Sequence, residues 1–253
     1  MRLAANASLL STVSSIALMG VAAAADLRLP TKAPIAPPPI WAGTYVGLNA
    51  GVAWHHWAFN DLDNQLFLLA APAPSPVNNE FWSGNRAAFT IGGQVGHNWE
   101  SGKFVYGVEA DLNYVDARSD LSFVHPRFPI LGVITGSTRL DWLATLRGRL
   151  GIALSPTLIY VTGGLAVAHV RDFYTFTPFP PGTEVVNDKT LVGYAVGGGG
   201  EHKLSPEWSV KVEGMYVGLE KSNVVKQRFN NTYRSEFKHS AATLRIGVNR
   251  KLP

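Results

Sequence analysis

Side chains alternate between apolar and polar character along several stretches of this chain. Residues 104–114 place apolar or aromatic side chains at even positions and mostly small, polar or charged ones at odd positions, and residues 140–150 repeat the alternation. Because successive side chains of a β-strand point to opposite faces, each stretch would form a ribbon with one apolar and one charged face. The charged side chains on the polar faces are Glu109, Asp111, Asp141, Arg147 and Arg149. This arrangement is typical of a membrane β-barrel, which has lipid outside and polar side chains inside.

The N-terminal residues have the composition of an export signal. Arg2 supplies a positive charge, an apolar stretch follows, and the alanine run at residues 22–25 offers a cleavage site, so we predict that residues 1–25 are a signal peptide. A membrane anchor helix is the alternative, but the stretch is short and weakly hydrophobic for a span of about 20 residues. Residues 26–40 are rich in proline, which predicts an extended periplasmic linker ahead of a barrel at residues 41–253.

Composition excludes several classes of site. The chain has no cysteine, so neither disulfides nor thiolate metal sites can form, and we expect no metal and no cofactor. Only 16% of the residues are charged, and the net charge is +4. With no basic run or aromatic RNA-binding motif, nothing points to nucleic acid as a partner.

The alternation recurs about eight times after residue 41, which predicts an all-β fold of eight antiparallel strands closed into a transmembrane barrel. The expected strands are residues 44–54, 88–99, 104–114, 140–150, 158–168, 191–202, 208–219 and 241–252. The short connections are residues 100–103, 155–157 and 204–207, and the long ones are residues 57–86, 117–137, 169–190 and 220–239. Outer-membrane barrels have short periplasmic turns and long extracellular loops, so both termini would be periplasmic.

Aromatic side chains are expected to form two girdles at the membrane–water boundaries. The girdle near the short turns would contain Tyr45, Trp99, Phe104, Tyr106 and Trp208. The girdle near the long loops would contain Trp54, Phe89, Tyr114, Trp142 and Tyr216. A soluble barrel is the alternative, but its alternation would be inverted, with apolar side chains inside and the charges outside.

Three motifs resemble one known family. Residues 41–51 (WAGTYVGLNAG), 142–151 (WLATLRGRLG) and 160–166 (YVTGGLA) are similar to strands of the small outer-membrane β-barrel proteins of alpha-proteobacteria, often labelled outer-membrane immunogenic or porin-family proteins. The resemblance implies an OmpA-type eight-stranded barrel in the outer membrane of a Gram-negative cell, inserted by the barrel-assembly machinery. One departure is the C-terminus, where Arg250 and Leu252 occupy positions that are usually aromatic in such barrels.

The inward charges have two interpretations. An eight-stranded barrel is just wide enough for side chains to fill it. Mixed charges would then pair as a plug, and the alternative is an ion-selective or small-solute pore. The predicted lumen network consists of Glu109, Asp111, Asp141, Arg147, Arg149, Glu201, Lys211, Glu213 and Arg245.

Two histidines suggest a further hypothesis. His55 and His56 lie where the first strand leaves the membrane, and imidazole can ligate iron. Surface haem binding is therefore a second alternative. The resemblance supports it, because it implies haem binding for some relatives. Adjacent strand residues point to opposite faces, which counts against one shared site. His239 and Ser240 could suggest a hydrolase, but as neighbours on a strand their side chains also point to opposite faces. We therefore predict no enzymatic activity.

The sequence therefore favours a structural and surface-contact protein, antigenic and supporting envelope integrity. Its partners would be outer-membrane lipid and lipopolysaccharide. The apolar loop stretches at residues 66–74 and 173–181 would offer extracellular contacts.

Overall fold

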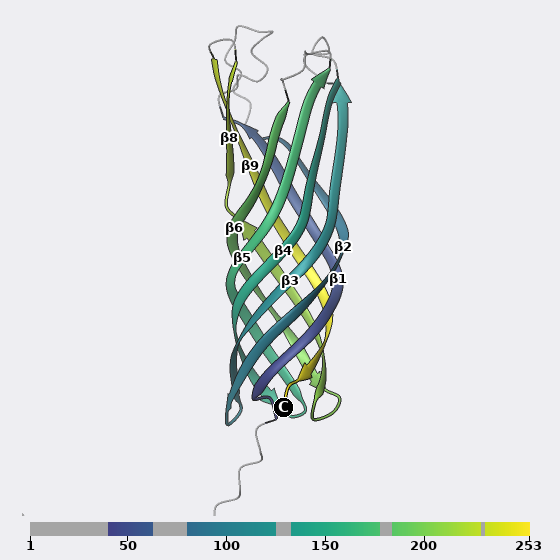
Figure 1. Cartoon of the computed structure of the whole chain (residues 1–253), viewed down its shortest axis with the longest axis vertical. Helices are drawn as coiled ribbons and strands as arrows, with labels where there is room; N and C mark the ends of the chain where they lie inside the picture. Colours follow the sequence, from purple (N-terminus) through teal and green to yellow (C-terminus); the bar gives the residue numbers. More distant parts are fainter. Residues whose placement is uncertain (1–39, 63–79, 125–132, 178–183, 229–230) are drawn as a thin grey trace, which may run out of the picture. The chain divides into compact units, whose positions relative to one another are not determined.

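The computed structural model describes residues 40–62, 80–124, 133–177, 184–228 and 231–253 (Figure 1). The chain divides into residues 1–38 and residues 39–253, and only the second unit contains described residues. The predicted signal peptide, the predicted linker except Ile40, and the apolar loop stretch at residues 66–74 lie outside the described residues.

Nine antiparallel strands make up the described fold. They are β1 (Gly43–Asp61), β2 (Glu80–Ser101), β3 (Phe104–Val124), β4 (Val133–Leu154), β5 (Thr157–Thr177), β6 (Val185–Lys203), β7 (Trp208–Leu219), β8 (Ser222–Arg228) and β9 (Asn231–Lys251). Eight of them close a ring in the order β1-β2-β3-β4-β5-β6-β7-β9, because β9 pairs back onto β1. Figure 1 shows these strands winding around the barrel with a common tilt. The predicted eight-stranded antiparallel barrel is thus confirmed, and no described segment is a helix able to span a membrane.

The two ends of the barrel differ in their connections. At one end, here called the turn end, β2 joins β3, β4 joins β5, and β6 joins β7 through short turns. Gly102 occupies one of these turns with a φ of 61°, a left-handed conformation that favours glycine. The opposite end, here called the distal end, carries the longer excursions.

The strands extend far into the segments that the sequence suggested as long loops. β3 continues to Val124 and β4 begins at Val133, so most of the expected loop at residues 117–137 is a β-hairpin. The expected loop at residues 220–239 is largely the hairpin of β8 and β9, in which β8 continues the line of β7 along β9. In the described parts of these segments, backbone pairing between the strands satisfies the backbone polar groups.

A register shift changes which positions of β4 face inward. It lies between Leu140 and Trp142, where Asp141 has no partner on β5. The shift between Tyr114 and Ala117 leaves the odd positions of β3 facing inward. Because an extra residue interrupts the alternation, Leu140 and Asp141 are both buried although they are neighbours. Beyond the bulge, even positions of β4 face inward, whereas odd positions do so nearer the turn end.

The outer wall is apolar between the aromatic side chains. Leucine, valine and isoleucine side chains such as Leu48, Leu112 and Leu165 are exposed there. Between the two groups of aromatic residues, no Asp, Glu, Lys or Arg occupies an outward position of the described strands. Nine of the ten expected girdle residues point outward: Trp54, Phe89, Trp99, Phe104, Tyr106, Tyr114, Trp142, Trp208 and Tyr216. Tyr194 and Phe173 are exposed on the same wall. Such a wall suits contact with lipid chains.

One residue of the expected girdles lies elsewhere. Tyr45 is only 5% exposed and points into the barrel. It has the parity of Asn49 and Ala53, both inward, rather than that of the outward Val46 and Leu48. Since side chains alternate along a strand, Tyr45 belongs to the interior.

Candidate functional site in the barrel interior

Eight of the nine residues of the predicted lumen network meet inside the barrel near the turn end. They are four acids and four bases, so their formal charges sum to zero. The members are Glu109, Asp111, Glu201, Glu213, Arg147, Arg149, Lys211 and Arg245, each at most 5% exposed. We call this set the charge network.

Asp111 stands at the centre of the charge network. One of its oxygens lies 2.7 Å from Arg147 Nη2 and the other 2.9 Å from Arg245 Nη1. Arg147 also lies 3.1 Å from Glu213, and Arg245 pairs with Glu213 as well. Thr145 donates a hydrogen bond to Asp111. Arg245 thus bridges two carboxylates and Arg147 three, since Arg147 Nη2 also lies 2.8 Å from Glu109. Shared pairing of this kind offsets the cost of burying the charges.

A second group of contacts links the charge network to the tyrosines near the turn end. Tyr45 donates a 2.7 Å hydrogen bond to Glu109, and Arg149 donates a 2.9 Å hydrogen bond to the Tyr45 hydroxyl. Arg149 Nη2 lies 2.8 Å from Glu201, and Lys211 Nζ lies 2.9 Å from Glu109. The carboxylates therefore share their partners, and no acid of the charge network is left without a cation.

Asp141, the ninth predicted member, is not part of the charge network. Its two oxygens lie 2.7 Å from Arg139 Nε and 2.7 Å from Arg171 Nε, both on the outer side of the wall. The cause is the bulge at Asp141, which has no register partner on β5, so its carboxylate contacts the exterior arginines rather than the lumen.

An apolar layer fills the barrel on the distal side of the charge network. The alternation of apolar and polar residues did not predict this layer. The layer consists of inward apolar side chains, and other inward positions of the same strands are polar or charged. The buried members are Ala53, Val115, Ala117, Leu140, Leu143, Ala166, Ala168, Val170, Leu191, Ala195, Met215, Val217 and Ala241. At the turn end, Trp41 packs with Val105, Leu158 and Tyr160. The charge network is thus enclosed by apolar side chains on both sides.

A second buried polar group, the distal cluster, lies beyond the apolar layer. His239 lies 3.2 Å from His55 and 3.1 Å from Asp172, and Asn187 donates a 2.8 Å hydrogen bond to the same Asp172 oxygen. Ser222 completes the cluster by donating to Asn187 at 2.8 Å. All five residues are at most 3% exposed. Sequence reasoning missed Asp172, Asn187 and Ser222 because they lie in segments expected to be loops.

Aromatic side chains cover one side of the distal cluster. Trp57, Phe59, Tyr174 and Phe237 form a buried aromatic group next to it. The distal cluster therefore has apolar neighbours on both sides, and its side chains face one another rather than an open cleft.

The paired histidines suggested for haem point to opposite sides of β1. His55 is fully buried and stacks on His239 with ring centroids 5.4 Å apart. His56 is exposed and lies 2.7 Å from Asn85 on the outer wall. The structure does not bring these two imidazoles together around one ligand. Within the described residues, no group of three or more His, Asp or Glu side chains is arranged to hold a metal ion.

Beyond the aromatic girdle of the distal end, the carboxylate of Glu236 has a lowered pKa. Glu236 on β9 lies 3.2 Å from Lys221 and accepts a 3.1 Å hydrogen bond from Asn60. Its slight burial raises the pKa, but the hydrogen bonds from Asn60 and Lys221 outweigh burial and lower the pKa of Glu236 below its ordinary value. Glu236 is therefore an anion that links β9 to Asn60 of β1 and to Lys221, the residue before β8, at the distal end.

Comparison with known proteins agrees with this architecture. The chain matches the family model described as outer membrane protein beta-barrel domain over residues 13–249. It is 28% identical to the 31 kDa outer-membrane immunogenic protein of Brucella melitensis over 97% of each chain. It is 27% identical to the 22 kDa outer membrane protein of Rhizobium leguminosarum, over 86% of this chain and 82% of that relative.

Among solved structures, the outer membrane protein OprG from Pseudomonas aeruginosa is similar with a TM-score of 0.40 and 10% identity, over 83% of this chain and 97% of that one. The family model and the named relatives locate the protein in the outer membrane. The chain belongs to the outer membrane protein beta-barrel domain family.

Proposed function

We propose that this protein is a structural, surface-exposed component of the outer membrane whose lumen is closed by its own side chains and which has no catalytic activity. The observation that supports the proposal most is the charge network, in which four acids and four bases neutralise one another while at most 5% exposed. A stable wall-to-wall plug of this kind would hold the barrel rigid and leave surface contact to its distal strands.

An ion passing through the lumen would have to overcome two separate free-energy barriers. Salt bridges such as Arg147 with Asp111 at 2.7 Å would have to open, which leaves buried charges unpaired. An ion would then have to cross the apolar layer, and hydrophobic constrictions exclude water and ions. A cavity of about 10 Å³ at the turn end, lined by Trp41, Lys203 and Asn249 among others, has room for about one water molecule.

Single-channel recording tests the closed lumen against the porin alternative. The purified barrel is inserted into a planar lipid bilayer, with a conducting porin as the positive control in the same apparatus. We expect insertion, verified by heat-modifiable gel mobility of the reconstituted protein, without steady current steps. Reproducible current steps from the folded protein would overturn the proposal in favour of a small-solute or ion channel.

The haem alternative has its own test. Absorbance in the Soret band is followed while haem is added to the folded protein and to the His55→Ala and His56→Ala variants. Because one imidazole is buried in the distal cluster and the other faces outward, we expect the same titration curve for all three. Loss of a saturable signal in either variant would favour surface haem binding.

A further inference from the structure

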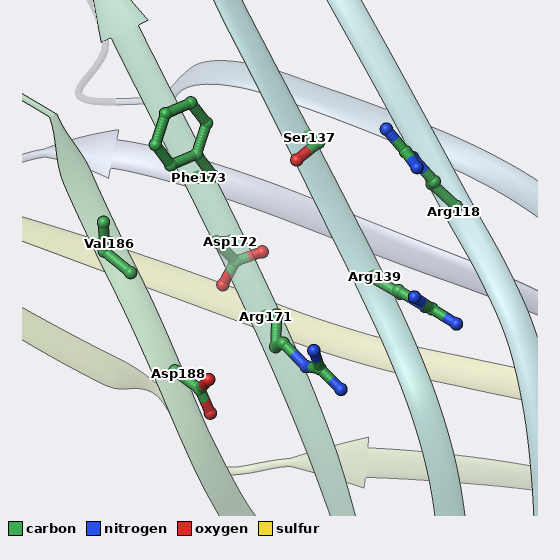
Figure 2. Close-up of a pocket in the computed structure, with 8 residues that line it drawn as sticks. All are labelled: Arg118, Ser137, Arg139, Arg171, Asp172, Phe173, Val186 and Asp188. Atoms are coloured by element: carbon green, nitrogen blue, oxygen red, sulfur yellow. The ribbon is translucent and has the colours of Figure 1, made fainter.

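Three arginines lie side by side on the outer wall of the barrel. Arg118 on β3 is the register partner of Arg139 on β4, which is the register partner of Arg171 on β5. Figure 2 shows them on neighbouring strands, with Asp188 of β6 next in the same row. We call Arg118, Arg139 and Arg171 the arginine row. Like charges directly opposite each other destabilise a sheet, and nearby aspartates of the protein offset part of this repulsion.

In the described part of the chain, the carboxylate contacts of Arg118 and Arg171 are made at Nε, and Arg139 has contacts at both Nε and Nη2. Arg118 Nε lies 3.0 Å from Asp120, and the Nε atoms of Arg139 and Arg171 each lie 2.7 Å from Asp141. Arg139 Nη2 has a longer contact of 3.5 Å with Asp116. Among the described residues, the terminal nitrogens of Arg118 and Arg171 have no such contact. These aspartates therefore fix the guanidinium planes and leave the terminal donors available.

The arginine row lies at the level of the lipid headgroups, next to the aromatic girdle on the distal side. Tyr114, Trp142 and His169 are register partners on the same three strands, and the last two rings stack with centroids 6.1 Å apart. The arginine row is the next charged level toward the distal end, beyond this part of the aromatic girdle. Aromatic girdles mark the level of lipid headgroups. With the turn end in the periplasm, the arginine row faces the headgroups of the outer leaflet.

We propose that the arginine row binds a phosphate group on the headgroup of an outer-leaflet lipid, that is, of a phosphorylated glycolipid. Guanidinium donors match phosphate oxygens in a planar, two-pronged geometry. A surface cavity of about 280 Å³ lies along the row, lined by the arginines together with Ser137, Phe173 and Val186 among others. The acyl chains of the same lipid would lie against the apolar wall below the girdle.

The surrounding charges identify the lipid rather than a soluble polyanion as the ligand. Around the three arginines lie four aspartates, Asp116, Asp120, Asp141 and Asp188, so the formal charges of these seven side chains sum to −1 and do not attract a free anion from solution. Binding must rest on directed hydrogen bonds combined with apolar contact. Only a ligand that carries both a phosphate and acyl chains provides the two together.

Native mass spectrometry in detergent tests the proposal. The folded barrel is titrated with bisphosphorylated lipid A and with the same lipid after removal of its phosphates. The test variant is R118Q/R139Q/R171Q. The matched control is K189Q/K221Q/K238Q, which removes three exposed cations of the distal strands on the other strands of the barrel. Folding of each variant is checked by heat-modifiable gel mobility.

We expect wild type and control to retain the phosphorylated lipid at least about tenfold more strongly than its dephosphorylated form. The test variant should lose this preference, since each basic residue at a membrane surface contributes about fivefold. R118K/R139K/R171K, which keeps the charge without the two-pronged geometry, should bind with intermediate strength. Three results would overturn the proposal: equal retention of both lipids by wild type, unchanged preference in the test variant, or equally tight binding of a sulfated oligosaccharide that lacks acyl chains.

Discussion

Arg245 on β9 and Asp111 on β3 form an ion pair of 2.9 Å across the barrel, although 134 residues separate them in the sequence. The two strands are not neighbours in the ring, since β1 and β2 lie between them. The pair therefore forms only when the barrel is closed, and it ties opposite parts of the wall together.

Removing both partners of this pair should cost less than the two single removals added together. Arg245→Met leaves Asp111 and Glu213 with fewer cations in a buried site, and we expect a loss of about 3–5 kcal/mol in the free energy of unfolding. The double variant Arg245→Met/Asp111→Leu should lose less than the sum of the two single variants, because it leaves fewer uncompensated charges. Urea unfolding in lipid vesicles, followed by tryptophan fluorescence, measures all three. Strict additivity would contradict the coupling described above.

Two adjacent glycines should respond oppositely to the same substitution. A Cβ on the inward Gly164 would lie 2.1 Å from the Leu146 carbonyl oxygen and 2.7 Å from Arg147 Cα, so Gly164→Ala forces the strands apart and should cost about 1–3 kcal/mol. The outward Gly163 has no heavy atom nearer than 3.8 Å to its Cβ position. Gly163→Ala should be neutral or stabilising by about 0.5 kcal/mol. The same unfolding assay decides, and equal effects would mean that β4 and β5 are packed differently.

A charge on the outer wall should be tolerated only near the distal end. Leu146 is 58% exposed and lies midway between the aromatic girdles, so Leu146→Arg should destabilise the barrel in lipid by about 2–4 kcal/mol. Val186 is also outward but lies beyond the girdle, and Val186→Arg should cost about 0–1 kcal/mol. Refolding yield and urea midpoint in vesicles provide the comparison. If both substitutions are harmless, hydrocarbon does not surround the wall at Leu146.

The distal cluster offers a test with a nearby control. His239→Leu removes the group that contacts both His55 and Asp172, and leaving buried polar atoms without partners should cost about 1–3 kcal/mol. His56→Leu changes an exposed imidazole and should stay within about 0.5 kcal/mol of wild type. Thermal unfolding in detergent, followed by circular dichroism, measures both. A His239→Leu variant as stable as wild type would show that the cluster contributes nothing to stability.

The charged interior was predictable because parity along a strand is a local property. Glu109, Arg147 and Glu213 alternate with apolar residues, and closing the ring brings all inward positions together. Which charges pair across the lumen was not predictable, since it depends on the stagger of strands that are distant in the sequence. Asp111 meets Arg245 only in the closed register.

Parity counting failed where the backbone departs from regular alternation. Asp141 has no register partner on β5, and its buried carboxylate contacts the exterior arginines Arg139 and Arg171 instead of the charge network. Tyr45 is a different case, because the parity of its position indicates the interior whereas its aromatic ring suggests a girdle position. Asp172 and Ser222 were missed because the strands run on through segments with weak alternation, where backbone pairing rather than pattern decides the structure.

The most direct test of the central claim uses the absence of cysteine from the chain. Spin labels are attached to single cysteines at Leu165, which faces outward, and at Ala166, which is buried inside. In lipid vesicles, the label at position 165 should collide readily with oxygen and poorly with a water-soluble nickel complex, whereas the label at position 166 should be immobilised and protected from both. The reverse result, with position 166 accessible to oxygen and position 165 immobilised, would mean that the charged face meets the lipid and would contradict the account.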